Sequence, residues 1–182
     1  GPTNFQSNLY RDPAAPVTGD QVYYTVDDAV KTLVNAGVPR AKINVGLPFY
    51  GRGWTGVAAG AKGDGLYQVA TGPAKGTYEQ GIEDYRVLVN RSAKQFNSPI
   101  AKQLWTYDGN EFWSYDDPAT IRGKLDYVRS QQLGGVFSWS LDGDDAQATL
   151  LKTSAEVRLD AATAAKRKAA AAAAKAKAAK KQ

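Results

Sequence analysis

The residues best suited to chemistry gather in one short stretch near the C-terminal end, GGVFSWSLDGDD. Two glycines precede a run of β-branched and aromatic residues, which ends in Trp139 and then in three acids, Asp142, Asp144 and Asp145. The pattern predicts a buried strand that delivers an aromatic ring and carboxylates to one rim of a sheet, where α/β proteins place ligand sites. The same pattern also fits a core tryptophan followed by acids that only cap the next helix.

Three residue types are absent from the 182 residues: Cys, His and Met. Without Cys the chain has no disulfide or cysteine zinc site, and without His it has no histidine catalysis. Acid–base chemistry must therefore come from Asp, Glu, Tyr or Lys, and we expect neither a metal nor a cofactor. No apolar run approaches about 20 residues, so we expect no membrane span. A signal peptide is not visible, and we expect any such signal to lie upstream of Gly1.

The positive charge is confined to the C-terminal tail. Residues 160–182 carry seven basic groups and one acid, whereas residues 1–159 carry 16 basic and 17 acidic groups. The near-neutral body gives no electrostatic reason to propose nucleic acid as a partner. The tail is an Ala/Lys sequence with no larger apolar side chain, which predicts a frayed, solvated helix or coil. It is either a linker or a nonspecific contact with an anionic surface such as nucleic acid or cell-wall polymer.

Apolar periodicity predicts three helices and two buried strands outside the central segment. The helices are expected over 25–37, 117–131 and 145–158, and the strands over 42–49 and 135–141. The apolar side chains expected to face the core are Val26, Val30, Leu33, Val34, Ile121, Leu125, Val128, Leu150 and Leu151. A helix, a short loop and a buried strand make half of an αβ unit, which predicts a parallel sheet.

Two segments break this α/β pattern. Residues 1–24, rich in Pro, Gly, Asn and Ser, predict a long loop of the kind that lies over a site. Residues 55–115 predict a small α+β insertion with a strand over 65–71, a short helix over 81–89 and a hairpin around an Asp-Gly turn. The aromatics of this hairpin fit either a hairpin core or a sugar-stacking wall. They are Trp105, Tyr107, Phe112, Trp113 and Tyr115.

Four blocks, in this order, resemble the C-terminal part of a bacterial chitinase of glycoside hydrolase family 18. The blocks are GPTNFQSNLY, KINVGLPFYGRGW, GTYEQGIEDYRVL together with WTYDGNEFWSYDDP, and GGVFSWSLDGDD. The resemblance implies an α/β fold: the C-terminal portion of a TIM (β/α)8 barrel with a small α+β insertion domain. The implied divisions are 1–54 (loop, helix and barrel strand seven), 55–115 (insertion), 116–159 (helix, strand eight and last helix) and the tail, 160–182.

The resemblance also implies a function, the hydrolysis of β-1,4 bonds in chitin or chito-oligosaccharides by a secreted enzyme. In that family the acetamido oxygen of the substrate attacks the anomeric carbon, a Glu protonates the leaving oxygen and an Asp orients the acetamide. By motif, Trp139 corresponds to the floor under the reacting sugar. Tyr50 and Arg52 correspond to cleft residues that contact the sugar or its acetyl group, and Trp54 to a residue on the leaving-group side.

The acid motif of the family, D-x-x-D-x-D-x-E, does not occur in this chain. None of its glutamates, Glu79, Glu83, Glu111 and Glu156, has an Asp two residues before it. The family's M-x-Y-D block is also absent, and we expect the chain to begin a few residues after it. Because two strands cannot close a barrel, we expect the chain alone to bind saccharide weakly and to hydrolyse nothing. A noncatalytic saccharide-binding protein is the alternative.

Overall fold

The computed structural model describes residues 2–158 and, beyond them, only the single positions 166, 169, 172, 173, 176 and 179. The predicted tail over 160–182 therefore lies almost entirely outside the described residues. Within the described part, no helix is long and apolar enough to cross a membrane. The same residues contain no cluster of three acids arranged as metal ligands.

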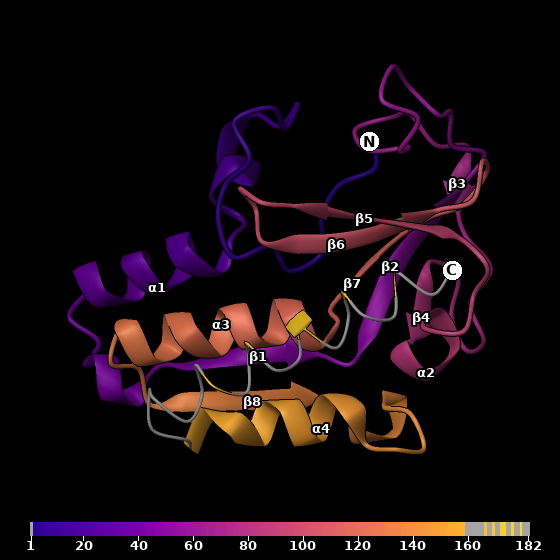
Figure 1. Cartoon of the computed structure of the whole chain (residues 1–182). Coiled ribbons are helices and arrows are strands. Elements are labelled where there is room, and N and C mark those ends of the chain that lie inside the picture. The colour runs from indigo at the N-terminus through magenta and orange to yellow at the C-terminus, as the bar shows by residue number, and fades with distance from the viewer. Residues whose placement is uncertain are drawn as a thin grey trace.

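Two parallel strands, β1 (Asn44–Pro48) and β8 (Gly135–Trp139), form a small sheet in which Pro48 pairs with Trp139. Figure 1 shows them side by side, next to α3 and α4. Side chains alternate across the sheet, so Val45 and Leu47 point to the core. The opposite face carries the exposed residues of both strands, among them Phe137 and Trp139.

Helix α3 (Pro118–Ser130) begins where its sequence predicts. Asp117 Oδ1 accepts from Thr120 N (2.8 Å), and Asp117 N donates to Thr120 Oγ1 (2.9 Å), which completes a capping box ahead of Pro118. The predicted apolar stripe of this helix is fully buried and packs on β1 and β8. Helix α1 (Val26–Asn35) also has its predicted cap, because Thr25 Oγ1 accepts from the backbone N of the third helical residue.

The last helix and two stripe residues differ from prediction. Helix α4 spans only Thr149–Ser154 and continues as a 3-10 turn, because Ala148 has a φ of 54° and the acids before it form turns. Leu33 and Leu151 were expected to face the core but are exposed. The 3-10 segments are Gly19–Tyr23, Arg40–Lys42, Leu141–Gly143 and Ala155–Arg158.

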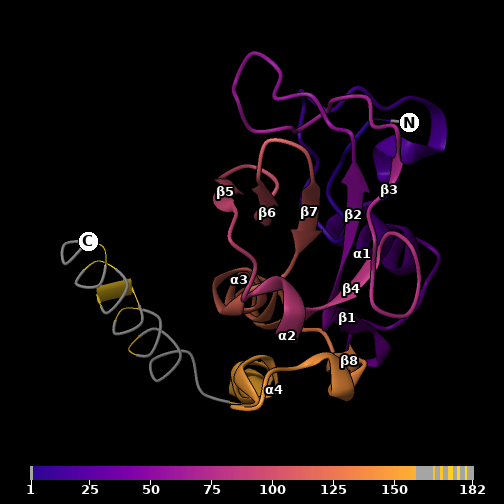
Figure 2. The ribbon, with the colours of Figure 1, turned by 90° about the vertical axis from the view of Figure 1, so that its right-hand side faces the viewer.

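A six-stranded antiparallel sheet stands beside the parallel pair (Figures 1 and 2), with strand order β3-β2-β7-β6-β5 and β4 also paired to β2. Its strands are β2 (Tyr50–Thr55), β3 (Gly72–Pro73), β4 (Ile82–Asp84), β5 (Lys94–Ser98), β6 (Gln103–Tyr107) and β7 (Phe112–Tyr115). Phe49 connects the two sheets because it lies between β1 and β2 in the chain; its N donates to Trp139 O of β8 (2.8 Å), and its O accepts from Tyr85 N (3.0 Å).

The structure decides between the two interpretations of the hairpin aromatics. It also corrects the secondary structure predicted for the rest of residues 55–115. All five hairpin aromatics are buried, so they form a core rather than a sugar-stacking wall. The strand predicted over 65–71 is wrong, because Leu66 and Tyr67 form a turn, Tyr67 has a φ of 59°, and Val69 makes only an isolated bridge to Pro2. Of the helix predicted over 81–89, only α2 (Tyr85–Leu88) forms, because β4 pairs with β2 instead. Strand β2 also extends the six-stranded sheet across the division predicted at residues 54 and 55.

Candidate ligand-binding site

A hollow of about 300 Å³ opens at the carboxyl ends of β1 and β8. Trp139, Tyr50 and Arg52 line it, although up to 89 residues separate them in sequence. Its volume lies at the lower end of about 300–1,000 Å³, the usual range for ligand pockets. The structure thus brings three of the four residues singled out from the sequence to one place.

Trp139 supplies the largest ring at the hollow and is 71 % exposed at the end of β8. Two residues earlier on the same face, Phe137 is 58 % exposed and also lines the hollow. The absence of a side chain at Gly46 gives the Phe137 ring its space, since a Cβ there would lie 3.1 Å from Phe137 Cζ. Sequence reasoning missed Phe137, yet period-two alternation from Trp139 would have placed both rings on one face.

Strand β2 presents Tyr50 and Arg52 to the hollow because glycines occupy the opposite face. A Cβ at Gly53 would lie 2.2 Å from the buried Trp113 ring, and one at Gly51 would lie within 3 Å of three atoms. The two glycines therefore allow the core side chains of the six-stranded sheet to pack directly against the backbone of β2. The alternating pattern Y-G-R-G directs the phenol and the guanidinium away from that core.

Trp54 continues the same alternation but does not line the hollow. Its ring contacts Phe112 edge to face, with centroids 5.9 Å apart, and it packs on the second core cluster of the six-stranded sheet. Half-buried there, it contributes to packing. A role for Trp54 on the leaving-group side stays a prediction.

Two of the three acids after β8 serve as caps. The Asp144 carboxylate accepts from Leu150 N (3.0 Å) and Leu151 N (2.8 Å), and Asp145 accepts from Thr149 N (2.9 Å). Both carboxylates thus satisfy backbone N–H groups at the start of α4 that would otherwise lack partners. For Asp144 and Asp145, the alternative in which the acids after Trp139 cap the next helix is therefore correct.

Asp142 is exposed and accepts a hydrogen bond from Ser140 Oγ. This bond holds the pKa of Asp142 below its usual value. A general acid for glycoside cleavage needs a raised pKa, so Asp142 is unsuited to that role.

The peptide bond between Trp139 and Ser140 is cis.

The N-terminal loop forms one wall of the hollow, through Gln6 and Ser7. Behind it lies a fully buried ion pair, in which Lys124 Nζ is 2.5 Å from Asp116 Oδ2. Lys124 Nζ also donates to Ser7 Oγ (2.9 Å). Burial lowers the pKa of Lys124, although the attraction of Asp116 acts against this shift. Sequence analysis predicted a loop over a site but identified none of these polar residues.

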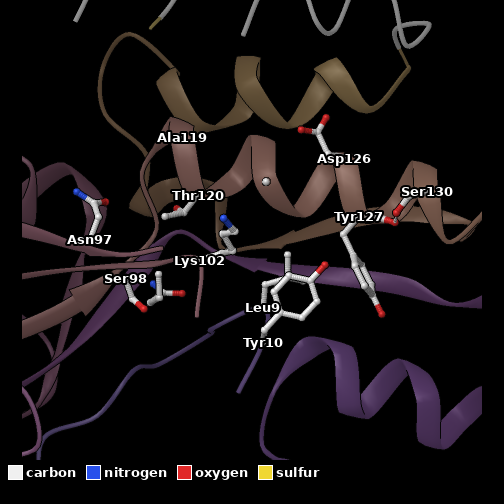
Figure 3. Close-up of a pocket in the computed structure, with 12 residues that line it drawn as sticks. Leu9, Tyr10, Asn97, Ser98, Lys102, Ala119, Thr120, Asp126, Tyr127 and Ser130 are labelled. Atoms are coloured by element: carbon white, nitrogen blue, oxygen red, sulfur yellow. Dashed lines mark hydrogen bonds between the residues drawn. The ribbon is translucent and has the colours of Figure 1, made fainter. Parts of the chain in front are cut away.

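A second hollow, of about 490 Å³, lies between α3 and the turn that joins β5 to β6 (Figure 3). Tyr10 and Tyr127 meet there edge to face, with centroids 6.1 Å apart. Tyr127 OH already donates to Asp27 Oδ1 (2.9 Å), and Ser98 Oγ accepts from Ala101 N (3.0 Å). Because these lining groups have internal partners, the hollow beside Trp139 is the stronger candidate.

Fold and hollow together define an α/β protein with a small-ligand site at the carboxyl ends of its parallel strands, walled by aromatic and hydrogen-bonding side chains. The sequence model of glycosyl hydrolases family 18 matches residues 2–144. The chain belongs to this family. The predicted fold class, an α/β C-terminal portion of a TIM barrel with a small α+β insertion, is confirmed.

Individual relatives agree with this assignment. Chitinase 63 of Streptomyces plicatus is 42 % identical over 151 residues, which are 83 % of this chain and 23 % of that protein. The catalytic domain of psychrophilic chitinase B from Arthrobacter TAD20 superposes with a TM-score of 0.77 at 37 % identity, over 87 % of this chain and 35 % of that one. Human YKL-39, described as a pseudo-chitinase with retained chitooligosaccharide binding, has a TM-score of 0.76 at 25 % identity, over 85 % and 45 %. The chain thus spans about a quarter of the length of the curated relatives it matches.

Proposed function

We propose that this chain forms the floor and one wall of a chitinase cleft that holds the N-acetylglucosamine units of chitin or chito-oligosaccharides. The observation that carries the proposal is the exposed Trp139 ring beside Tyr50 and Arg52 in one hollow. A pyranose ring has apolar C–H faces that can stack on an aromatic ring. Tyr and Arg side chains supply the hydrogen bonds that fix its orientation.

In the proposed reaction, a β-1,4 bond breaks with retention through the substrate-assisted mechanism of the family. The acetamido oxygen of the sugar above Trp139 attacks the anomeric carbon, while Tyr50 and Arg52 hold the sugar or its acetyl group. The Glu that protonates the leaving oxygen belongs to the D-x-x-D-x-D-x-E motif, which this chain does not contain. Hydrolysis therefore requires polypeptide beyond these residues. Because chitin is an insoluble polymer, the proposed site of action is outside the cell.

The 182-residue chain alone is expected to hydrolyse nothing, because among residues 2–158 no Asp or Glu lines the hollow to act as the glycosidase acid. The measurement is release of fluorophore from a fluorogenic chitobiose glycoside. A full-length relative that contains the acid motif serves as positive control. Turnover by the chain above the buffer background would show that this proposal is wrong.

The alternative is a noncatalytic chitin-binding protein. Human YKL-39, a pseudo-chitinase by its description, shows that relatives of this fold can keep oligosaccharide binding without being counted as chitinases. The two functions differ in what happens when the rest of a family barrel, including its acid motif, is added. Hydrolysis by the combined protein supports the enzyme, whereas binding without hydrolysis supports the alternative.

Trp139→Ala is expected to weaken binding of chitotetraose to the chain by about tenfold or more. Covering an aromatic side chain with ligand contributes about 1.5–3 kcal/mol, and about 1.4 kcal/mol is one factor of ten. Isothermal titration calorimetry measures the change. Tyr24→Ala is the matched control, because Tyr24 is 74 % exposed yet does not line the hollow. Equal affinities for the Trp139 variant and the wild type would remove Trp139 from the site.

A further inference from the structure

Gln6 lines the same hollow as Trp139 and Arg52, and it also lines the neighbouring hollow along the N-terminal loop. Its Oε1 is buried and has no hydrogen-bond partner. Within residues 2–158, the hydrogen bonds of Gln6 involve its backbone and not this amide. Buried polar groups in folded proteins almost always have partners, so an amide left without one calls for an explanation.

The backbone around Gln6, in contrast, is held firmly. Gln6 N donates to Ser114 Oγ on β7 (3.1 Å). The next residue, Ser7, donates from Oγ to Asp116 Oδ2 (3.1 Å) and accepts from Lys124 Nζ (2.9 Å). The segment is therefore anchored to the six-stranded sheet and to α3 at once. An anchored backbone with a side-chain end that has no internal partner is the arrangement of a preorganised contact residue.

The chemistry of the amide indicates what it contacts. Among the residues that line the hollow, Gln6 alone carries a side-chain carbonyl, whereas the Arg52 guanidinium can only donate. The Gln amide presents one acceptor and one donor group side by side, and its terminal torsion is broad and roughly two-fold. A rotation about that torsion can turn the two groups of the amide together toward a ligand in the hollow. A second amide, with its own N–H and C=O, is the group that pairs with both.

We propose that Gln6 is a specificity-determining residue that binds the 2-acetamido group of a sugar in the hollow. This inference rests on the proposed saccharide-binding function. It goes further by assigning discrimination between N-acetylglucosamine and glucose units to one side chain. A glucose unit has a hydroxyl in place of the acetamido group and leaves half of the Gln6 amide unpaired.

The test compares affinities of the whole 182-residue chain for chitotetraose and cellotetraose by isothermal titration calorimetry. Gln6→Met keeps the length and approximate volume of the side chain and removes both polar atoms. It is expected to weaken chitotetraose binding by about tenfold, the effect of losing a paired hydrogen bond, and to leave cellotetraose binding unchanged. The melting temperature is expected to stay the same or rise, because an unpaired buried acceptor is removed. Gln21→Met is the matched control, since Gln21 does not line the hollow.

The outcomes separate the two proposals. If the wild-type chain binds neither tetrasaccharide, the proposed function fails and the role of Gln6 fails with it. If the wild type binds chitotetraose and Gln6→Met retains the same ratio of affinities for the two ligands, only the role of Gln6 is overturned. An equal loss for both ligands also overturns it, because the residue then shapes the hollow without recognising the acetamido group.

Discussion

Gly53→Ala is expected to lower the free energy of unfolding by about 3 kcal/mol, the upper part of the usual range for overpacking a core. A Cβ at this position would lie 2.2 Å from Cδ2 and 2.4 Å from Cε2 of Trp113. Trp113 cannot yield easily, because it is fully buried in the main core cluster and its Nε1 donates to Glu111 (3.0 Å). Either the ring or β2 must shift. Urea denaturation followed by tryptophan fluorescence measures the loss.

Gly72→Ala is the matched control for Gly53→Ala. Gly72 also lies in a strand of the six-stranded sheet, but a Cβ there meets nothing within 4 Å and its φ is not in the left-handed region. Its replacement is expected to change stability little or to stabilise by about 0.4–1 kcal/mol, through the unfolded state. If both alanine variants unfold at the same urea concentration, close packing of Trp113 on β2 is not what requires glycine at position 53.

A shift of β2 in Gly53→Ala is also expected to affect the ligand-binding site, because the two faces of this strand contact the core and the hollow. The face with Gly53 packs on the core, and the face with Tyr50 and Arg52 lines the hollow. A displaced β2 therefore moves both hydrogen-bonding side chains. Saccharide binding is expected to fall in Gly53→Ala even where enough folded protein remains to measure it.

Local sequence patterns predicted the elements whose structure depends on local signals and burial. The capping residues and apolar stripe of α3 predicted a helix that begins at Pro118. The Asp-Gly turn predicted the hairpin of β6 and β7. Strand β5 was missed because its sequence, KQFNS, is mostly polar and does not alternate. It forms through backbone pairing with β6 and through Phe96, which stacks on Trp105 with ring centroids 5.5 Å apart.

The candidate site was predictable only in part. The resemblance to family 18 singled out Trp139, Tyr50 and Arg52, and alternation along β8 could have added Phe137. Gln6 had no such signal, because a loop has no periodicity and its place at the hollow depends on Ser114, 108 residues away. That contact is tertiary and is set by how the N-terminal loop crosses β7.

The buried position of Lys124 could have been predicted from its place in the helix, although lysine is usually a surface residue. Lys124 lies three residues after Ile121 and one before Leu125, within the buried stripe of α3. Lysine is almost never fully buried without a partner. A lysine in an apolar stripe therefore indicates a buried acid, and here that acid is Asp116.

Lys124→Met is expected to lower the free energy of unfolding by about 3–5 kcal/mol, because it leaves the carboxylate of Asp116 buried without its cation. Met retains most of the aliphatic volume, so the loss reports the charge rather than a cavity. Ser7 and Gln103 still hydrogen-bond the carboxylate but bring no positive charge. Urea denaturation at neutral pH measures the change, and a loss below about 1 kcal/mol would contradict the buried pair, since it is the size expected of an exposed one.

The double variant Lys124→Met/Asp116→Asn separates the charge from the packing. Asn is neutral and nearly the same size as Asp, so most of the lost stability is expected to return. The bond from Lys124 Nζ to Ser7 Oγ is still missing in this variant. Because that bond anchors the loop segment with Gln6, chitotetraose binding is expected to stay weaker than in the wild type. Recovered stability with reduced affinity would show that the buried network positions the wall of the hollow as well as stabilising the fold.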